Sequence, residues 1–482
     1  MSKDILVPNA VNKLMQDAMY GRASRRDLIK RGSALGLSGV LMGSILNISS
    51  VGAQDASPAS QEAGWSLTKP EWLDADFSGV ELNVVLGSDG PGRPFDQACC
   101  DFFAEHTGAT VNYIQGAESA TDRLTYYTQT LNAQATDFDV FTVDVIWPGI
   151  LAVHAHDLSE AAEELAEAGS TFFDRILSNN RIGDTLVSIP NYTDAGMLYT
   201  RTDLLEKYGV DAPTTWADLE EAAAAIQEGE RGEGNDSFVG YTFQAAAYEG
   251  LTCNSLEWVF SNGGGSFIEE DGTVSANSDQ AKAAIERAKG WVGNIAPSAV
   301  TSYMEEDSRA VWQGGNAAFH RNWPYVYSIS QADDSELQDQ FSVGLLPMGD
   351  GDGADNAATL GGWNMMVSKY SQNIDAATAF AKYMSSFEVQ KARAIERSLN
   401  PTVVEVYDDE DVLAANPYQA DFFPVFDGGS VARPSAVTAD LYNDASVAIF
   451  TTVNELLSGQ QDDVDGAMDS LADELDSIMQ DV

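Results

Sequence analysis

The sequence is poor in cysteine and histidine, which limits the metal chemistry that it can support. It has three Cys and four His among 482 residues. No spaced set of Cys and His is present, so a zinc site is not expected. We predict that Cys99, Cys100 and Cys253 are buried thiols on helices. His154 and His156 form an isolated HxH pair, which we interpret as structural or incidental.

Basic residues are also scarce. The chain has 26 Lys and Arg against 74 Asp and Glu, for a formal net charge of −48. Because a field of this sign repels phosphate, nucleic acid and anionic membrane surfaces are not expected as partners. The hydrophobic content of 44% and aromatic content of 10% argue against disorder. We interpret the charge as a solvated acidic shell, and salt adaptation is the hypothesis that follows.

The motifs of several common enzyme classes are missing. The glycine-rich stretch GSDGPG lacks the spacing of a dinucleotide fingerprint, and no phosphate-binding loop or serine-hydrolase elbow is present. No cofactor and no metal are therefore expected. Paired carboxylates of the glycosidase type stay open, because 71 acidic residues after residue 53 offer many chance pairs.

The first 53 residues differ in charge from the rest of the chain. They carry seven Lys and Arg against three Asp, for a net charge of +4, whereas the remainder has −52. Arg25 and Arg26 precede a weakly apolar, Gly- and Ser-rich run that ends in Val51-Gly52-Ala53. This pattern resembles a twin-arginine export signal, with a short anchor helix as the alternative. A linker is predicted over 54–77, and no later run is apolar enough to cross a membrane.

Beyond residue 77 the sequence alternates between strand and helix patterns, which predicts α/β lobes with largely parallel sheets. Length suggests about two to three lobes. Thr214 or Thr215 is the candidate N-cap of a helix. A strand pair with a glycine step is predicted at 358–371, one helical segment at 375–398, and two helices in the C-terminal tail.

Similar side chains recur where the predicted strands end. Each group combines a flat ring with a carboxylate or amide, and often with a glycine or proline. Because ligands of open α/β sheets lie at the carboxyl ends of strands, we expect these groups to meet. The groups are Asp144 with Trp147, Asn191 with Tyr192 and Asp194, Glu249 with Trp258, Trp323 with Tyr325, and Gly361-Gly362-Trp363-Asn364.

This mixture of residue types suits a sugar. Sugar hydroxyls need directional acceptors, which Asp, Glu and Asn supply, and the flat C–H faces of a sugar can be covered by Trp and Tyr. In the stretch HRNWPYVYS, we expect Pro324 to start a helix, Trp323 to face a cleft and Tyr325 to offer a second platform. We assign Tyr327 to packing. Any single tryptophan of the set could equally lie in the core.

Several stretches in this order resemble one known family, the extracellular solute-binding proteins of ABC-type sugar importers. The nearest likeness is to its trehalose/maltose-binding branch, with a salt-adapted archaeon as the expected source. The resemblance covers the chain from about residue 80 to the C-terminus. It is carried by FDVFTVDVIWPG, IPNYTDAGMLYTRTDLLEKYG, AYEGLTCNSLEW, SYMEEDSRAVWQGGNAAFHRNWPYVYSIS, GGWNMMVSKYSQN, VQKARAIERSLNPT and the ARP at 432–434.

The resemblance implies a two-lobed periplasmic-binding-protein type II fold, with the ligand held in the cleft between the lobes. It further implies a monomer outside the cytoplasm that catalyses nothing and delivers a sugar to a membrane permease. Asp89 or Asp96 is a candidate for an additional acid in the first strand-turn. The implied ligand contacts are Asp144, Tyr192, Asp194, Trp323, Gly361, Trp363 and Arg433, with Glu249 and Arg123 as further candidates.

The same resemblance suggests lobe boundaries and leaves the ligand open. Lobe one is placed at 78–191 with 361–406, and lobe two at 192–360 with 407–482. Ser435 stands where the family has a second arginine, so the sugar is not fixed. A trehalose- or maltose-like disaccharide or glucose is expected. The alternatives are a secreted glycoside hydrolase that acts on oligosaccharides and a binding protein for another solute, such as a polyol or glycerol phosphate.

Overall fold

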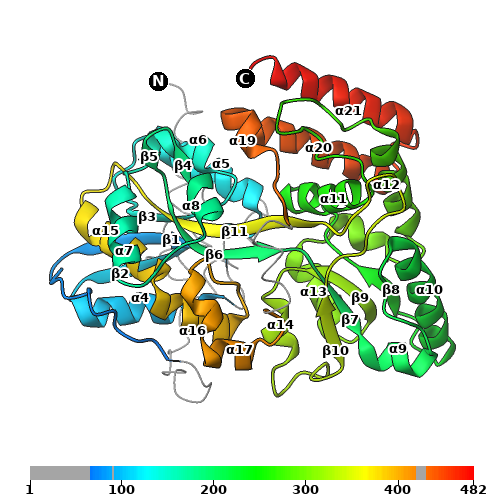
Figure 1. The fold of residues 1–482 in the computed structure, drawn as a ribbon, viewed down its shortest axis with the longest axis horizontal. Helices are drawn as coiled ribbons and strands as arrows, with labels where there is room; N and C mark the ends of the chain where they lie inside the picture. Colours follow the sequence, from blue (N-terminus) through cyan, green and yellow to red (C-terminus); the bar gives the residue numbers. More distant parts are fainter. Residues whose placement is uncertain (1–65, 89–91, 420–429) are drawn as a thin grey trace, which may run out of the picture. The chain divides into compact units, whose positions relative to one another are not determined.

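The computed structural model describes residues 66–88, 92–419 and 430–482, all within one compact unit, Gly64–Val482. The twin-arginine and cleavage-site predictions, the first part of the predicted linker and Asp89 lie outside the described residues. Two β-sheets organise the unit, each with helices packed against it (Figure 1). We call the sheet that contains the first strand, with its helices, lobe one, and the other sheet with its helices lobe two.

The sheet of lobe one has strand order β12-β11-β3-β1-β2, and β6 pairs with β11 on its other edge. Its central strands are buried on both faces, as the apolar runs in the sequence require, whereas the edge strand β2 is only partly buried. In β1, Leu82, Val84 and Leu86 pack on one side with helices α4 and α15, whereas Val85 packs on the other side with α5. The strands are β1 (Glu81–Leu86), β2 (Thr110–Gln115), β3 (Val140–Asp144), β6 (Ile189–Ala195), β11 (Ala358–Val367) and β12 (Ser430–Val431).

The sheet of lobe two has strand order β10-β7-β9-β8. A large apolar core joins one side of this sheet to α10, α11, α12 and α20, and a second, smaller core packs its other side against α13 and α14. The strands are β7 (Met197–Arg201), β8 (Val239–Thr242), β9 (Ala317–Asn322) and β10 (Phe341–Gly344).

The helices that carry most of the packing are long and begin at side-chain caps in several cases. Thr215 caps α10 in a capping box with Asp218, which confirms the predicted N-cap. These helices are α4 (Arg93–Thr107), α5 (Ala120–Asn132), α7 (Ser159–Glu167), α10 (Trp216–Gly232), α11 (Glu249–Ser261), α12 (Asp279–Trp291), α13 (Glu305–Gln313), α15 (Ile374–Ser385), α16 (Phe387–Arg397), α20 (Tyr442–Leu457) and α21 (Val464–Met479).

Shorter elements complete the described chain. They are α6 (Pro148–Leu151), η1 (Ala152–His154), α8 (Asp174–Asn179), β4 (Arg181–Ile182), β5 (Thr185–Leu186), α9 (Thr202–Tyr208), η2 (Ser298–Ser302), α14 (Val326–Ser330), η3 (Val404–Asp408), α17 (Glu410–Ala415), α19 (Ser435–Thr438) and η5 (Ala439–Leu441).

The chain passes between the two sheets at Gly196 and again between Gly344 and Ala358. Strands β6 and β11 therefore run through the centre of the molecule between the lobes (Figure 1). Gly196 is required at its crossing because a Cβ there would stand 2.0 Å from Glu257 Oε1. The Glu257 carboxylate in turn forms a buried ion pair with Arg321 of β9. This crossing thus has no room for a side chain.

Two sequence-based predictions of the fold were wrong. The sheets are mixed, not largely parallel. In lobe one, β11 enters from lobe two and runs antiparallel to both β3 and β6, and in lobe two, β7 runs antiparallel to both β9 and β10. The predicted strand pair at 358–371 is one strand, β11, in which Gly362 has φ +126° beside a register shift. The predicted helical segment 375–398 is confirmed, and it consists of two helices, α15 and α16, that are separated where Ser386 caps the second.

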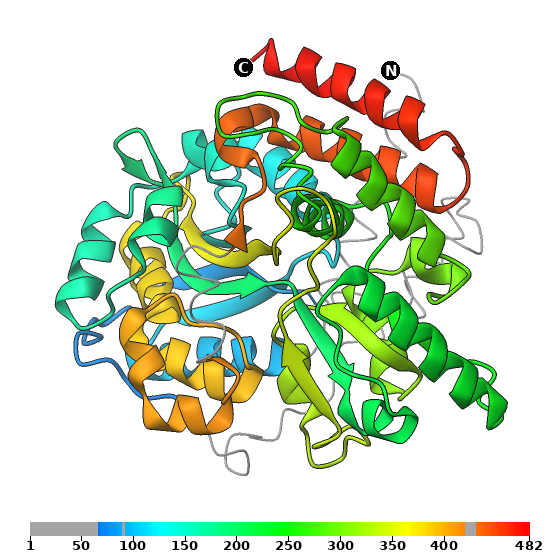
Figure 2. The same cartoon turned by 45° about the vertical axis from the view of Figure 1, so that its right-hand side comes forward.

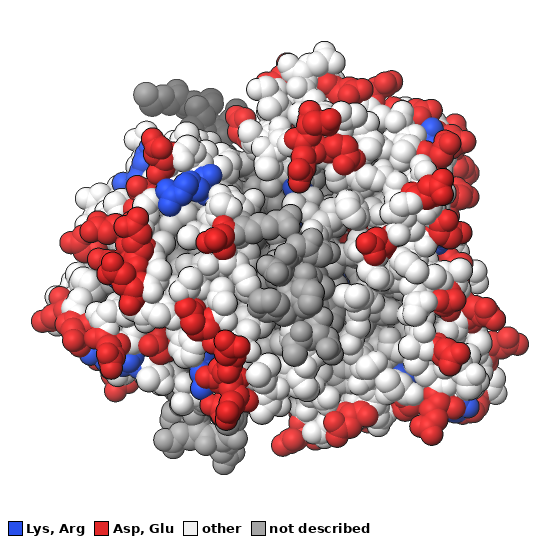
Figure 3. Space-filling view, in the orientation of Figure 1, with Lys and Arg blue, Asp and Glu red and all other residues white. Residues whose placement is uncertain are grey.

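Other local predictions are confirmed. The C-terminal tail forms two helices, α20 and α21, that lie side by side along α11 and α12 (Figure 2). Cys99, Cys100 and Cys253 are free, buried and helical. His154 is bonded to the Tyr370 hydroxyl at 2.9 Å. Acidic side chains spread over both lobes on the face shown in Figure 3, and basic ones are few there.

Candidate functional site: a cavity between the two lobes

A cavity lies between the lobes and is lined by residues from both of them. Its volume is about 230 Å³, whereas a site for one water needs about 10–15 Å³ on the same measure. A ligand much larger than water therefore fits. All nine predicted ligand contacts line this cavity: Arg123, Asp144, Tyr192, Asp194, Glu249, Trp323, Gly361, Trp363 and Arg433. Their roles in binding stay a prediction.

The register of the lobe-one sheet brings four of these residues together. Trp363 of β11 pairs with Asp144 of β3 on one side and with Tyr192 of β6 on the other. Gly361, two residues before Trp363, pairs with Asp194. Because residues two apart on a strand point to the same face, these side chains form one patch. Only Asp144 ends its strand, so the expectation that all groups stand at strand ends was wrong for β6 and β11.

The aromatic residues divide into cavity and core. Tyr192, Trp323, Tyr325 and Trp363 are half-buried and line the cavity. Trp147 and Trp258, which the sequence places in similar groups, are each 1% exposed and belong to the cores of the two lobes. Tyr327 packs against Phe341 and Tyr418, as expected for a packing residue.

The two tryptophans of the cavity are held by arginines. The Arg321 guanidinium lies 4.1 Å from the centre of the Trp323 ring, and that of Arg123 lies 4.5 Å from the centre of the Trp363 ring. Such cation–π contacts fix the orientation of a ring. The indole N–H of Trp323 also donates to Glu305 Oε1 at 3.3 Å. The backbone carbonyl of Trp323 accepts a hydrogen bond of 2.8 Å from the Tyr199 hydroxyl.

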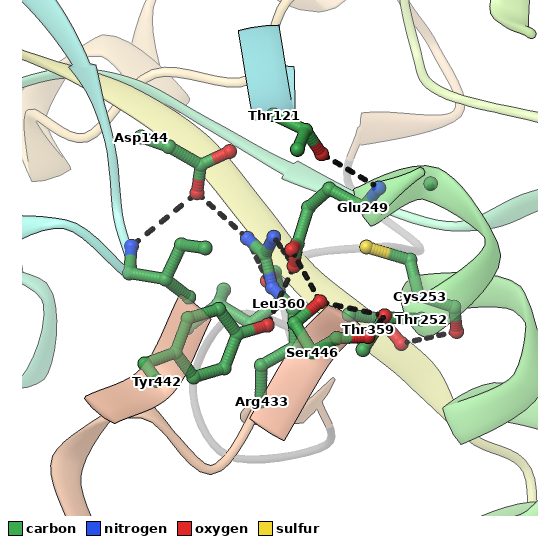
Figure 4. Close-up of polar contacts among 12 residues, drawn as sticks. Thr121, Asp144, Glu249, Thr252, Cys253, Thr359, Leu360, Arg433, Tyr442 and Ser446 are labelled. Carbon is green, nitrogen blue, oxygen red and sulfur yellow. Dashed lines mark hydrogen bonds and ion pairs between the residues drawn. The ribbon is translucent and has the colours of Figure 1, made fainter. Parts of the chain in front are cut away.

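Arg433 connects acidic residues of the two lobes. Its Nη2 donates to Asp144 Oδ1 at 2.8 Å, and its Nη1 donates to Glu249 Oε1 at 2.8 Å (Figure 4). Asp144 belongs to lobe one and Glu249 begins helix α11 of lobe two. All three side chains are buried. Buried charges of this kind are tolerated because each is paired.

The Glu249 carboxylate accepts further bonds from the C-terminal helix α20. The Tyr442 hydroxyl donates to Oε1 at 2.5 Å and the Ser446 hydroxyl to Oε2 at 2.7 Å (Figure 4). Burial raises the pKa of this carboxyl, and Arg433 opposes that rise. Helix α20 therefore holds the Glu249 side chain in place at the cavity, a role that the sequence did not indicate.

Unlike the Glu249 carboxylate, the Asp194 carboxylate lacks hydrogen-bond donors on one of its oxygens within the described chain. Its Oδ1 is buried and has no hydrogen-bond partner among the described residues. Burial, together with the nearby negative charge of Asp144, raises the pKa of Asp194 to about 7, against the opposing effect of Arg321. A ligand that donates a hydrogen bond would satisfy this oxygen.

Several residues of the cavity were not among the predicted contacts. Glu305 and Glu306 open helix α13, which the sequence reading did not identify as an element. Glu118 of lobe one lies near them, and its pKa is raised by burial and by acids of α13. Asp96, a candidate from the sequence, lines the cavity, together with Arg393 and Arg397 of α16. The sequence could have indicated these two arginines, because their four-residue spacing places both on the same face of a helix.

The described residues contain no group of three or more His, Cys, Asp and Glu that could hold a metal ion. Within the same part of the chain, no helix combines the length and the apolar character that a membrane crossing needs.

Comparison with known proteins identifies the class. Residues 88–391 match the bacterial extracellular solute-binding protein family. A probable ABC transporter-binding protein of Deinococcus radiodurans is 42% identical over 78% of this chain and 89% of its own length. The chain belongs to the bacterial extracellular solute-binding protein family. It is the extracellular solute-binding component of an ABC transporter, and the glycoside-hydrolase alternative is not supported.

Solved structures agree with this fold. The maltose-bound structure of MalE3 from T. maritima has a TM-score of 0.78 and 33% identity, over 83% of this chain and all of that one. The GacH receptor of Streptomyces glaucescens, solved unliganded and with acarbose, has a TM-score of 0.71 and 22% identity over 84% of this chain and all of its own. The predicted two-lobed periplasmic-binding-protein fold is confirmed.

Proposed function

We propose that the solute held between the lobes is a sugar of one or two rings, of the trehalose, maltose or glucose kind. The observation that carries the proposal is the composition of the cavity. Half-buried rings from both lobes, Trp323 and Trp363 among them, line the same space as the carboxylates of Asp144 and Asp194. Rings cover the apolar faces of a sugar, and carboxylates accept bonds from its hydroxyls.

Simple energetics are compatible with this ligand. A ring buries roughly 150–250 Å², at roughly 25 cal/mol per Å² of apolar area. A hydrogen bond to a charged group adds about 1.5–3 kcal/mol. Three or four such contacts, less the cost of association, reach the roughly 8 kcal/mol of a micromolar site. The maltose in the MalE3 structure, at 33% identity, supports the same class of ligand.

The nine predicted residues act in this proposal as direct or supporting contacts of the sugar. Arg123 and Trp363 come from lobe one, and Trp323 and Glu249 come from lobe two. A ligand that touches both lobes favours the closed arrangement, because it gains contacts that the open one lacks. The closed, loaded form then delivers the sugar to the permease of the importer.

Further features of the chain belong to the same proposal. The sequence-based lobe boundaries, 78–191 with 361–406 for lobe one and 192–360 with 407–482 for lobe two, stay part of this proposal. They count the end of β6, the start of β11 and all of β12 with lobe two, whereas the definition by sheets used above counts these segments with lobe one. Residues 1–53 direct export by the twin-arginine route. The protein works as a monomer, has no nucleic-acid partner and belongs to the trehalose/maltose branch. The net charge of −48 reflects salt adaptation in an archaeal source.

Calorimetric titration tests the ligand. The full chain is titrated with trehalose, maltose, glucose and maltodextrins, and tryptophan fluorescence is followed in parallel. We expect a dissociation constant of roughly micromolar order for at least one of these sugars. Absence of both heat and fluorescence change with every sugar would reject a sugar ligand.

Repeating the titration in low and high salt tests the salt hypothesis. Salt adaptation predicts that ligand binding and the melting temperature fall in low-salt buffer, where the acidic side chains repel one another over longer distances. Full binding and an unchanged melting temperature in low salt would contradict it.

A further inference from the structure

Two arginines of helix α16, Arg393 and Arg397, are four residues apart and therefore lie on one face of the helix. Both line the cavity between the lobes. Their side chains are 2% and 7% exposed, so water solvates their charges poorly. The Arg393 guanidinium lies 5.6 Å from the centre of the Tyr192 ring, which is itself one of the proposed sugar contacts.

Each arginine keeps an unused donor. Arg393 donates through Nη1 to the carbonyls of Asn191 and Met384, at 3.1 and 3.4 Å, but its Nη2 has no partner in the described chain. Arg397 Nη1 is likewise buried without a partner. Among the residues that the structure describes, neither guanidinium forms an ion pair. A buried unpaired donor is costly, and a buried unpaired charge more so.

The local charge around these donors is not balanced. Asp96 is the carboxyl of the cavity whose charge acts on both arginines, and it also feels Arg123. Among the described residues that line the cavity, this one carboxyl thus acts on three guanidinium groups, and Glu396, which does not line the cavity, also acts on Arg397. Burial lowers the pKa of Arg397, although Asp96 opposes that effect. Other acidic side chains of the cavity lie away from α16: Glu118 is close to the acidic residues at the start of helix α13. The cavity therefore has a cationic pole on α16.

We propose that Arg393 and Arg397 form an anion subsite, and that the sugar bound beside it carries a carboxylate. The ligand class is then a sugar acid, and this inference rests on the proposed sugar-binding function. The planar guanidinium forks match a carboxylate, which they can bind through paired N–H···O bonds. A sugar hydroxyl would satisfy the unused donors but would leave the charge of the subsite unbalanced. A carboxylate would both accept bonds from the unused donors and balance the charge.

The test uses two matched pairs of ligands. Maltobionate and maltitol differ only in a carboxylate that replaces a CH₂OH group, and glucuronate differs from glucose in the same way. Each is titrated into the full chain by calorimetry, with trehalose and maltose as neutral references. We expect the acid to bind about tenfold or more tightly than its neutral twin in at least one pair.

Substitutions assign the preference to the two arginines. Arg397→Gln and Arg393→Gln should each bring the ratio of acid to neutral affinity down to about one, because each removes half of the subsite. Arg287→Gln is the matched control. Arg287 pairs with Asp350 on the surface of lobe two, outside the cavity, so this variant should keep the full preference. Circular dichroism verifies that each variant is folded.

Thermal unfolding supplies a second measurement that is independent of binding. If Arg397 is an unpaired charge kept for a ligand, Arg397→Met should melt at the same or a higher temperature than the parent. A lower melting temperature would make Arg397 a structural residue and overturn the subsite.

The outcomes separate this inference from the proposed function. Binding of neutral sugars, with neither acid tighter than its neutral twin, would overturn the anion subsite and leave the sugar-binding proposal standing. No binding by any sugar, neutral or acidic, would overturn both. An acid preference that survives Arg397→Gln and Arg393→Gln would also overturn the assignment to these residues.

Discussion

Gly361 of lobe one lies directly against the Trp323 ring of lobe two. A Cβ at position 361 would stand 3.1 Å from Trp323 Cζ3 and 3.2 Å from Asp194 Cβ. Gly361 pairs with Asp194 across the two strands, so the sheet register fixes this approach. The missing side chain lets a ring from one lobe meet the sheet of the other.

Gly361→Ala should therefore displace Trp323 and weaken sugar binding by about tenfold, which is roughly 1.4 kcal/mol. The fold should survive, because the neighbours need to move by only a few tenths of an ångström. Calorimetry with the best sugar measures the change. Gly290→Ala, on helix α12 with nothing within 4 Å of its Cβ, is the control and should bind normally. Equal affinity in the two variants would contradict the role of Gly361.

Trp323→Ala removes a ring of the proposed sugar platform. We expect affinity to fall by about ten- to a hundredfold, or roughly 1.4–2.8 kcal/mol, with the fold intact because this ring is only half-buried. Trp72→Ala is the matched control, since Trp72 packs at the edge of the lobe-one core, away from the cavity. A folded Trp323→Ala variant with parental affinity would refute the platform.

Arg433→Met leaves the Asp144 and Glu249 carboxylates buried without their shared cation. Removing one partner of a buried ion pair costs about 3–5 kcal/mol, so the free energy of unfolding in urea should fall by that order. Adding Glu249→Gln should recover part of the loss, because one of the two stranded charges is gone.

The control for that experiment is Arg287→Met. Its partner, Asp350, has a side chain that is 75% exposed, so the loss should be about 0–1 kcal/mol. Equal losses for Arg433→Met and Arg287→Met would mean that the ion pairs at the cavity contribute no more than a surface pair.

The pKa of Asp194 predicts a pH dependence of stability. Its value of about 7 in the folded protein exceeds the ordinary 3.8, so the folded state binds this proton more tightly than the unfolded state. The contribution of Asp194 to stability is then greatest at low pH and is lost as the pH rises from about 4 to about 7. Each pKa unit corresponds to about 1.4 kcal/mol.

Asp194→Asn removes this titration while keeping the size of the side chain. The free energy of unfolding of the variant should therefore rise relative to that of the parent between pH 4 and pH 7, and the difference should level off above pH 7. Urea unfolding at several pH values measures it. Parallel curves for the two proteins would contradict a raised pKa at Asp194.

Much of the local structure could be predicted from the sequence. Apolar runs such as that of β1 specify strands buried on both faces, and Thr215 with Asp218 marks the start of α10. The candidate site was predicted by residue type, because a sugar site needs rings and carboxylates together. That reasoning also selected Trp147 and Trp258, which are core residues. Residue type alone does not distinguish a half-buried ring from a buried one.

The sequence by itself determined the acidic charge, the alternation of strands and helices, and the residue types from which the cavity is built. Only the tertiary structure decided which of them meet. Trp363 lies between Asp144 and Tyr192 because β11 returns to lobe one antiparallel to β3 and β6. Arg433 pairs with Asp144 across 289 positions of the sequence. Strand register and chain crossing join distant segments, so no local pattern of residues encodes them.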